Sequence, residues 1–274
     1  MDKLVKAINS TKEYSIVACT TTHIMKQIVD NHKIVTGFSN NISDIVSANV
    51  LMSANLKDEK ESISLNLNTN GMLSQIISNG NYSGKFNGYG ILNDKPAKRI
   101  VGEGVLEVYR YYDSKELRSS QVAVSSTDIS EIIVDYYFQS EQVYSVVLLA
   151  SISDKKTDEF YGSGGILIQL LPNASEEVKE SINEALKKIE GLSKQIALGM
   201  SAEEMVKLID ASAHILESKD IEFKCDCTRE SVLDSVKVLD YDEIMKIIEE
   251  DGGLKVVCNS CNKSYVFQKE DFDE

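Results

Sequence analysis

The chain has little of what most catalytic sites need. Its 274 residues include no tryptophan, two prolines and three histidines. His23, His32 and His214 are scattered, so a Ser-His-Asp or Cys-His catalytic arrangement is hard to assemble. No apolar run approaches the roughly 20 residues that span a bilayer, and residues 1–10 lack the apolar core and cleavage site of a signal peptide. We expect a soluble, intracellular (cytoplasmic) protein that is not an enzyme.

Basic residues are also scarce. Lysine and arginine number 29 against 43 aspartates and glutamates, which gives a formal net charge of −14. The longest basic run is a pair, whereas nucleic acids and anionic membranes attract clustered Lys and Arg. Neither is an expected partner.

Residues 221–274 carry 7 basic and 14 acidic residues, half of the excess charge, together with four of the five cysteines. This shift in composition predicts a separate C-terminal domain.

Residues 1–172 mix strand and helix patterns, which predicts one α+β domain with a mainly antiparallel sheet. The expected strands cover residues 14–20, 63–67, 84–90, 101–110, 121–125, 144–152 and 166–171, and the expected helices residues 22–32, 42–56 and 128–139. The stretch 162–165 (Gly-Ser-Gly-Gly) lacks the P-loop lysine and the dinucleotide fingerprint. We interpret it as a turn into the strand that follows.

Residues 173–220 form a predicted helical linker. One helix carries apolar side chains over 178–189, and a second, capped by Ser201 with Glu204, carries Met205, Leu208, Ile209 and Leu216. These apolar stripes need a partner, most simply the first domain. The linker is then either a structural connector or a detachable cover over an apolar surface.

Four cysteines in two close pairs dominate residues 221–274. Cys225 and Cys227 are separated by 30 residues from Cys258 and Cys261, a pattern that suits a tetrahedral zinc site. Helices over 231–239 and 240–250 and strands over 255–257 and 264–267 place the second pair at a hairpin turn. His214 is a weak candidate ligand, because four thiols already complete a tetrahedron. Cys19, within an apolar strand, is expected to be a buried core residue.

Three interpretations of this cluster compete. A small module with few large apolar residues needs a staple, which favours a permanent structural zinc site. The Cys-x-Cys arm, one residue shorter than the usual Cys-x-x-Cys, would close a strained disulfide ring, and strained bridges are the labile, regulatory kind. That favours a redox-labile zinc site. Constitutive disulfides are disfavoured in a cytosolic chain. From these residues alone, structural and redox-switching zinc remain open.

Six stretches resemble the redox-regulated 33-kDa heat-shock chaperone family of bacteria. They are residues 223–230 (FKCDCTRE), 249–253 (EEDGG), 257–261 (VCNSC, followed by Tyr265 and Phe267), 136–142 (YYFQSEQ), 164–172 (GGILIQLLP) and 56–62 (LKDEKES). The chain departs from the family pattern at Asn87, where an arginine is usual, at Val143, where a proline is usual, and over 117–120 (LRSS). All four cysteines match.

The resemblance implies an ATP-independent holdase of the oxidative and heat stress response. The reduced protein would bind one Zn²⁺ through Cys225, Cys227, Cys258 and Cys261 and be inactive. Oxidation would form Cys225–Cys227 and Cys258–Cys261 disulfides, expel zinc and unfold the zinc module and the linker. The exposed apolar surface would capture unfolded client proteins, with a homodimer as the usual active form. The implied domains are 1–172 (substrate binding), 173–220 (linker) and 221–274 (zinc redox switch).

Two other functions remain as alternatives. One is a constitutive zinc-stapled interaction or regulatory module without redox switching. The other is a thiol oxidoreductase, for which the pair Cys258 and Cys261 would have to open a helix in a βαβ context. The strands predicted on both sides of this pair argue against the second alternative.

Overall fold

The computed structural model describes residues 1–172, 174–187, 189 and 191–272. It divides into two compact units, which we call the sheet unit (Met1–Phe223) and the cysteine unit (Lys224–Glu274). Residue 173, the predicted start of the linker, lies outside the described residues. None of the helices in the described ranges is long and apolar enough to cross a membrane.

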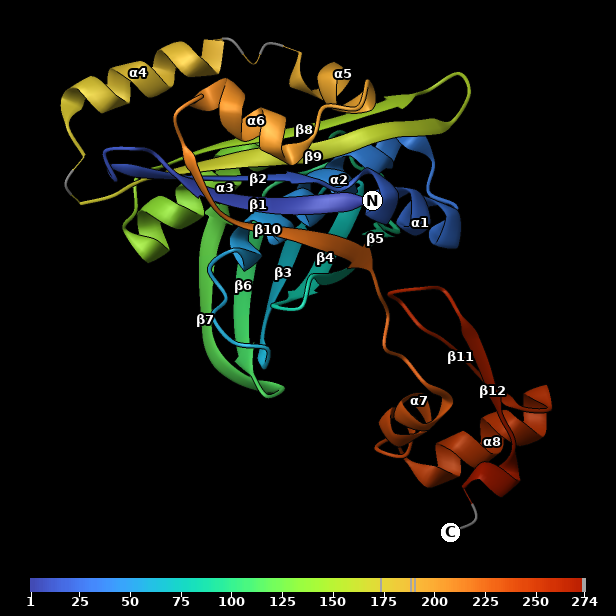
Figure 1. Cartoon of the computed structure of the whole chain (residues 1–274). Helices are drawn as coiled ribbons and strands as arrows, with labels where there is room; N and C mark the ends of the chain where they lie inside the picture. Colours follow the sequence, from blue (N-terminus) through green and yellow to red (C-terminus); the bar gives the residue numbers. More distant parts are fainter. Residues whose placement is uncertain (173, 188, 190, 273–274) are drawn as a thin grey trace. The chain divides into compact units, whose positions relative to one another are not determined.

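A curled, mainly antiparallel sheet forms the sheet unit, which confirms the predicted α+β fold class (Figure 1). Its described strands are β1 (Asp2–Ile8), β2 (Tyr14–Thr20), β3 (Glu61–Thr69), β4 (Leu73–Asn81), β5 (Lys85–Leu92), β6 (Gly104–Tyr112), β7 (Lys115–Val124), β8 (Ser145–Asp154), β9 (Glu159–Leu170) and β10 (His214–Phe223). Their order is β7-β6-β3-β4-β5-β10-β1-β2-β9-β8. Two antiparallel halves meet where β5 and β10 pair in parallel, at Lys85–Glu222 and Phe86–Phe223.

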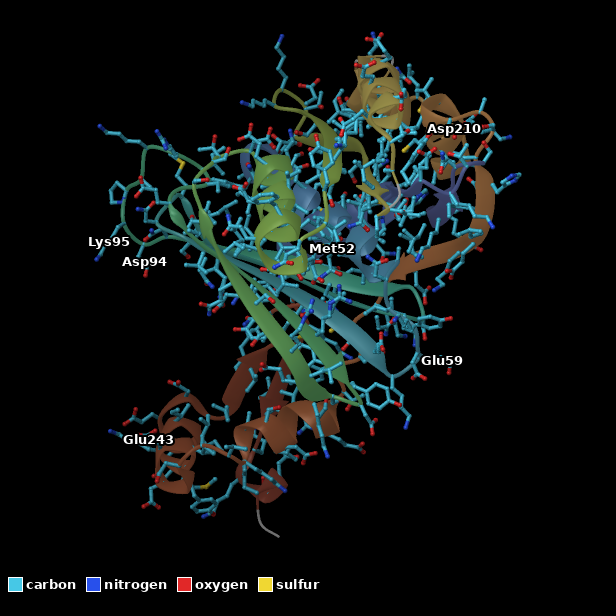
Figure 2. All side chains as sticks on the ribbon, turned by 90° about the vertical axis from the view of Figure 1, so that its left-hand side faces the viewer. Met52, Glu59, Asp94, Lys95, Asp210 and Glu243 are labelled. Carbon is cyan, nitrogen blue, oxygen red and sulfur yellow. The ribbon has the colours of Figure 1, made fainter. Side chains whose placement is uncertain are left out.

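Three helices fill the space between the halves: α1 (Thr22–His32), α2 (Thr36–Ser53) and α3 (Ile129–Tyr136). A π-helical turn, η1 (Tyr137–Glu141), continues α3. Helix α2 contacts strands of both halves and is buried on nearly every face, as expected of a helix at the centre of a core. Met52, labelled in Figure 2, is one of its fully buried side chains.

A second core lies on the other face of β1, β2, β8 and β9. Helices α4 (Glu176–Lys187), α5 (Leu192–Ala197) and α6 (Ala202–Ile209) lie over that face (Figure 1) and bury Ile182, Ile196 and Met205 against Ile16 and Ile168. Ser201 and Glu204 form the predicted capping box of α6. The prediction that the linker stripes pack on the first domain is therefore confirmed. We call α4–α6 the covering helices.

Two sequence predictions are wrong. The second linker helix ends at Ile209, because Asp210 turns extended and accepts a hydrogen bond from the Ser212 amide at 2.8 Å. Leu216 lies instead in strand β10, which pairs with β1 along its length, so the segment is only partly helical. The glycine-rich stretch 162–165 lies inside β9, not in a turn. There a Cβ on Gly164 would lie 2.2 Å from the Cys19 carbonyl oxygen, so glycine is needed for close strand packing.

The cysteine unit combines two helices with a hairpin. These elements are α7 (Arg229–Val236), α8 (Tyr241–Asp251), β11 (Leu254–Val257), β12 (Ser264–Phe267) and a 3-10 turn, η2 (Lys269–Asp271). Asp240 caps α8 by accepting from two backbone amides, and Gly252 ends it in the left-handed region. Both ends agree with the predicted helix, and the hairpin agrees with the predicted strands.

Candidate metal centre

The four predicted cysteines come from two loops of the cysteine unit. Cys225 and Cys227 lie between β10 and the N-terminus of α7, where Thr228 caps the helix. Cys258 and Cys261 lie in the β11–β12 turn, which is closed by a hydrogen bond from the Cys258 amide to the Lys263 carbonyl. Each loop is held by its own cap or turn. Each loop therefore contributes two thiols to the cluster.

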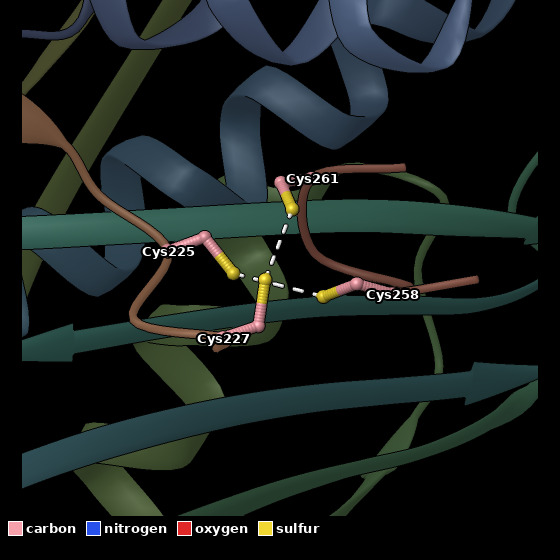
Figure 3. A group of neighbouring side chains, drawn as sticks. All are labelled: Cys225, Cys227, Cys258 and Cys261. Carbon is pink, nitrogen blue, oxygen red and sulfur yellow. Dashed lines mark hydrogen bonds between the residues drawn. The ribbon is translucent and has the colours of Figure 1, made fainter. Parts of the chain in front are cut away.

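The four sulfurs gather at one point (Figure 3). All Sγ atoms lie within 4.8 Å of one another, and the thiols are half-buried. Two close contacts join the two loops, with Cys225 Sγ 3.6 Å from Cys258 Sγ and Cys227 Sγ 3.4 Å from Cys261 Sγ. A tetrahedral ion with Zn–S bonds near 2.3 Å needs sulfurs about 3.8 Å apart. The donor set and its spacing thus fit a metal ion of the zinc type.

Three thiols of the cluster have shifted pKa values, and the shifts differ in direction. Burial raises the pKa of the Cys225 and Cys261 thiols. Burial also raises that of Cys227, but hydrogen bonds from the Tyr265 hydroxyl and the neighbouring thiols outweigh it and lower the pKa to about 7. The Tyr265 hydroxyl lies 3.3 Å from Cys227 Sγ and 3.0 Å from the Cys227 carbonyl oxygen, so its single proton is directed at one or the other of these two acceptors. Cys227 is therefore converted more readily than Cys225 or Cys261 to the thiolate that a metal requires.

Arg229 ties the first cysteine loop to the end of the chain. Its guanidinium donates to both carboxylate oxygens of Asp271, at 2.9 and 2.8 Å, and to the Val266 carbonyl at 2.8 Å. It also lies over the Phe267 ring, 4.6 Å from the centroid. In the sequence, Arg229 is noticeable only as part of the stretch 223–230. No local pattern reveals a contact that spans 42 residues.

The hydrophobic core of this unit is small. Its buried side chains among the described residues are Val236, Ile244, Ile248, Tyr265, Phe267 and Phe272, and Cys227 and Cys258 pack against them. Isolated modules of this size rarely obtain more than about 3–5 kcal/mol from such a core. A metal bound by the four cysteines would add to this small core, because it would join the loop before α7 to the β11–β12 turn.

The remaining predicted residues lie elsewhere. Cys19 is fully buried in β2, as predicted, and burial raises its pKa. His214 begins β10 in the sheet unit, paired with Ile8, and does not belong to the cysteine cluster that the structure describes.

Comparison with known proteins identifies the family. The family model described as Hsp33 protein matches residues 2–268. The chain belongs to the Hsp33 family. A 33 kDa chaperonin of Clostridium acetobutylicum is 32% identical over 98% of this chain and 95% of its own length. One from Bacillus pumilus is 31% identical over 100% of this chain and 98% of its own.

The fold has a counterpart among solved structures. The crystal structure of a 33 kDa chaperonin from Thermotoga maritima superposes with a TM-score of 0.88, covering 99% of this chain and 96% of that one at 23% identity. Hsp33 membership supports a chaperone function. The four clustered cysteines are consistent with a metal-binding member of the Hsp33 family.

Proposed function

We propose that this protein is an ATP-independent holdase, inactive when reduced and zinc-bound and activated by oxidation. The observation that carries the proposal is the second core, an apolar sheet face that includes Val5, Ile16 and Ile168. It is covered by helices α4–α6, and the same chain continues through β10 into the cysteine unit. The clients would be unfolding proteins that bind the uncovered face.

The metal links the cysteines to folding. Zn²⁺ held by Cys225, Cys227, Cys258 and Cys261 would supply an apparent ~10–16 kcal/mol of folding free energy. This exceeds what the small core of the cysteine unit provides. Thiolates that become oxidised no longer bind the ion, so oxidation should unfold the unit.

Oxidation is proposed to join Cys225 to Cys227 and Cys258 to Cys261. Each pair of thiolates gives two electrons to one hydrogen peroxide molecule as its S–S bond forms, and the peroxide O–O bond breaks and takes up two protons to leave as two water molecules. In the folded cluster, sulfurs of opposite loops also lie in close contact. Pairing within a loop is nevertheless favoured once the unit loosens, because closing a ring of a few residues costs far less entropy than closing one across 30.

We propose that strand β10 transmits the unfolding of the cysteine unit to the covering helices. Most of its side chains are exposed and Ile221 is the buried one, so backbone hydrogen bonds to β1 hold it in place. The Ser218 hydroxyl donates to Glu203 of α6 at 2.9 Å, and Lys3 of β1 lies 3.4 Å from the same carboxylate oxygen. Loss of β10 would therefore remove a contact that secures α6.

The test compares zinc content and chaperone activity in one sample. Reduced protein should hold one zinc per chain and fail to suppress light scattering by a heat-unfolding test protein. Peroxide should release the zinc and produce suppression without ATP, and sedimentation of the active form should show a homodimer. Equal suppression before and after peroxide, or no zinc release, would instead support a constitutive zinc-stapled interaction module.

A further inference from the structure

A large cavity opens in the sheet unit, and none of the five cysteines lines it. Its volume is about 1,220 Å³, above the range of most small-molecule sites. Its walls come from residues 54–57 after α2, from strands β1, β6 and β7, from the π-helical turn η1 and from the end of β9. The cavity thus lies where the two halves of the sheet diverge.

Three stretches that carry the family resemblance meet at this cavity. Leu56 and Lys57 come from the first, Tyr137, Glu141 and Gln142 from the second, and residues 169–172 from the third. The π-helical turn is itself a rare element, often found at functional sites. It ends at Gln142 in the left-handed region, with φ of 55°. The proposed redox switch assigns no role to this site.

The cavity is cationic although the chain is acidic. Of the described residues that line it, Lys6, Lys57, Arg110, Arg118 and Lys179 are basic and Glu141 is the acidic one. The protein as a whole carries a net charge of −14. Positive side chains gathered in one concavity raise the local concentration of anions.

A polar cluster at the wall fixes the geometry of these charges. Arg118 contacts the Glu141 carboxylate directly, and Arg110 Nη2 lies 4.0 Å from the same oxygen. The Tyr136 hydroxyl donates to it at 2.7 Å. The Arg118 side chain is still 47% exposed. Two guanidinium groups against one carboxylate leave a positive charge facing the cavity.

The rim adds apolar surface. Leu117, Tyr144 and Leu216 line the cavity, and each is more than half exposed. A small inorganic anion would make no use of these side chains. A polypeptide segment with carboxylates next to apolar side chains matches both the charge and the rim.

We propose that this cavity binds acidic-apolar segments of client polypeptides, with Arg110 and Arg118 recognising the carboxylates. The identity of the occupant rests on the proposed chaperone function. Glu141 competes with the ligand for the same two arginines and sets the affinity.

The experiment measures fluorescence anisotropy of short labelled peptides on the reduced, full-length chain, because there α4–α6 still cover the apolar face proposed to capture clients, so the cavity is tested separately from it. Leucines are interspersed with glutamates in one peptide, with lysines in the second and with glutamines in the third. The glutamate peptide should bind most tightly, and added salt should weaken it. Arg118→Gln should weaken it about tenfold, the effect of one charged hydrogen bond.

The decisive control is a variant that should change peptide binding in the opposite direction. Glu141→Gln removes the same ion pair as Arg118→Gln, so a merely structural role predicts weaker binding in both variants. Our inference predicts tighter binding of the glutamate peptide by Glu141→Gln. Lys95→Gln, an exposed lysine away from the cavity lining (Figure 2), should leave binding unchanged.

The outcomes separate this inference from the proposed function. Peroxide-activated suppression of aggregation without any glutamate preference overturns the cavity assignment alone. Binding of inorganic triphosphate that depends on Arg118, with no glutamate preference, also overturns it. A glutamate preference with the expected variant pattern, but no activation by peroxide, supports the cavity and contradicts the redox switch.

Discussion

At the scale of single residues, the four thiols of the cluster differ in their surroundings. Tyr265 contacts Cys227 through its hydroxyl, while burial raises the pKa of Cys225 and Cys261. Metal binding requires all four as thiolates. Metal binding therefore has to displace protons that burial makes harder to remove from Cys225 and Cys261.

Replacing one ligand should abolish zinc binding. Cys258→Ser removes one of the four sulfurs, and a hydroxyl is a poor zinc ligand at neutral pH. Elemental analysis of the reduced variant should show less than one-tenth of the wild-type zinc, an order-of-magnitude loss or more. Cys19→Ala also removes a thiol, but from the core of the sheet unit, and should keep its zinc. Full zinc in Cys258→Ser would refute the ligand assignment.

Disulfide mapping gives a second test at this scale. Proximity in the folded cluster favours Cys225–Cys258 and Cys227–Cys261, whereas loop closure after metal loss favours pairing within each loop. We expect peptide mapping of peroxide-treated protein to find Cys225–Cys227 and Cys258–Cys261, with Cys19 reduced. Mainly inter-loop bridges would show that oxidation occurs in the folded cluster and contradict the proposed order of events.

The cysteine cluster could be predicted from sequence because its chemistry lies in residue type and spacing. Cys225 and Cys227 needed no fold to suggest a metal. The cavity cluster was different, since Arg110, Arg118 and Glu141 come from β6, β7 and η1 and meet only through strand pairing. No spacing rule relates them in the sequence. The stretches 56–62, 136–142 and 164–172 and the departure over 117–120 fall in this region, but nothing in them indicated an ionic cluster.

At the scale of elements, the covering helices are short and depend on tertiary packing. Helix α6 spans eight residues, well below the roughly 12–15 at which isolated helices become marginal. Its stability comes from the capping box at Ser201 and from the buried Met205 and Val206. The hydroxyl of Tyr14 on β2 also donates to Asp210 at 2.9 Å.

Breaking this packing should activate the protein without oxidant. Met205→Asp places a carboxylate in the second core, at a cost of several kcal/mol. The reduced variant should suppress aggregation and keep one zinc per chain. Lys207→Asp introduces the same side chain on the exposed face of α6 and should stay inactive. An inactive, folded and zinc-bound Met205→Asp variant would show that the apolar face is not the client site.

Local sequence patterns predicted some helices and strands correctly and missed others, for physical reasons. Helix α1 and strand β12 have the predicted bounds because their burial follows a clear period. Strands β1 and β4 were not predicted, and β10 was taken for helix. Most of the side chains of β10 are exposed, so its place depends on backbone pairing with β1, which lies about 200 residues away.

At the scale of the whole molecule, strand β10, which we propose links the cysteine unit to the covering helices, is part of the sheet. β10 separates β1 from β5 in the strand order. A chain cut at Pro172 would therefore lose both the covering helices and a central strand, leaving the edges of β1 and β5 unpaired. Aggregation suppression by such a fragment would not separate these effects. A measurement on the intact chain is more direct.

Hydrogen exchange of the full-length protein, followed by mass spectrometry while zinc release is monitored, tests the central claim. In reduced protein, α5, α6 and α8 should be protected. After peroxide, the amides of these helices and of β10 should lose protection together with the zinc, while β2 and β9 keep theirs. An oxidised protein that has lost zinc and suppresses aggregation, yet keeps α5 and α6 protected, would contradict the account.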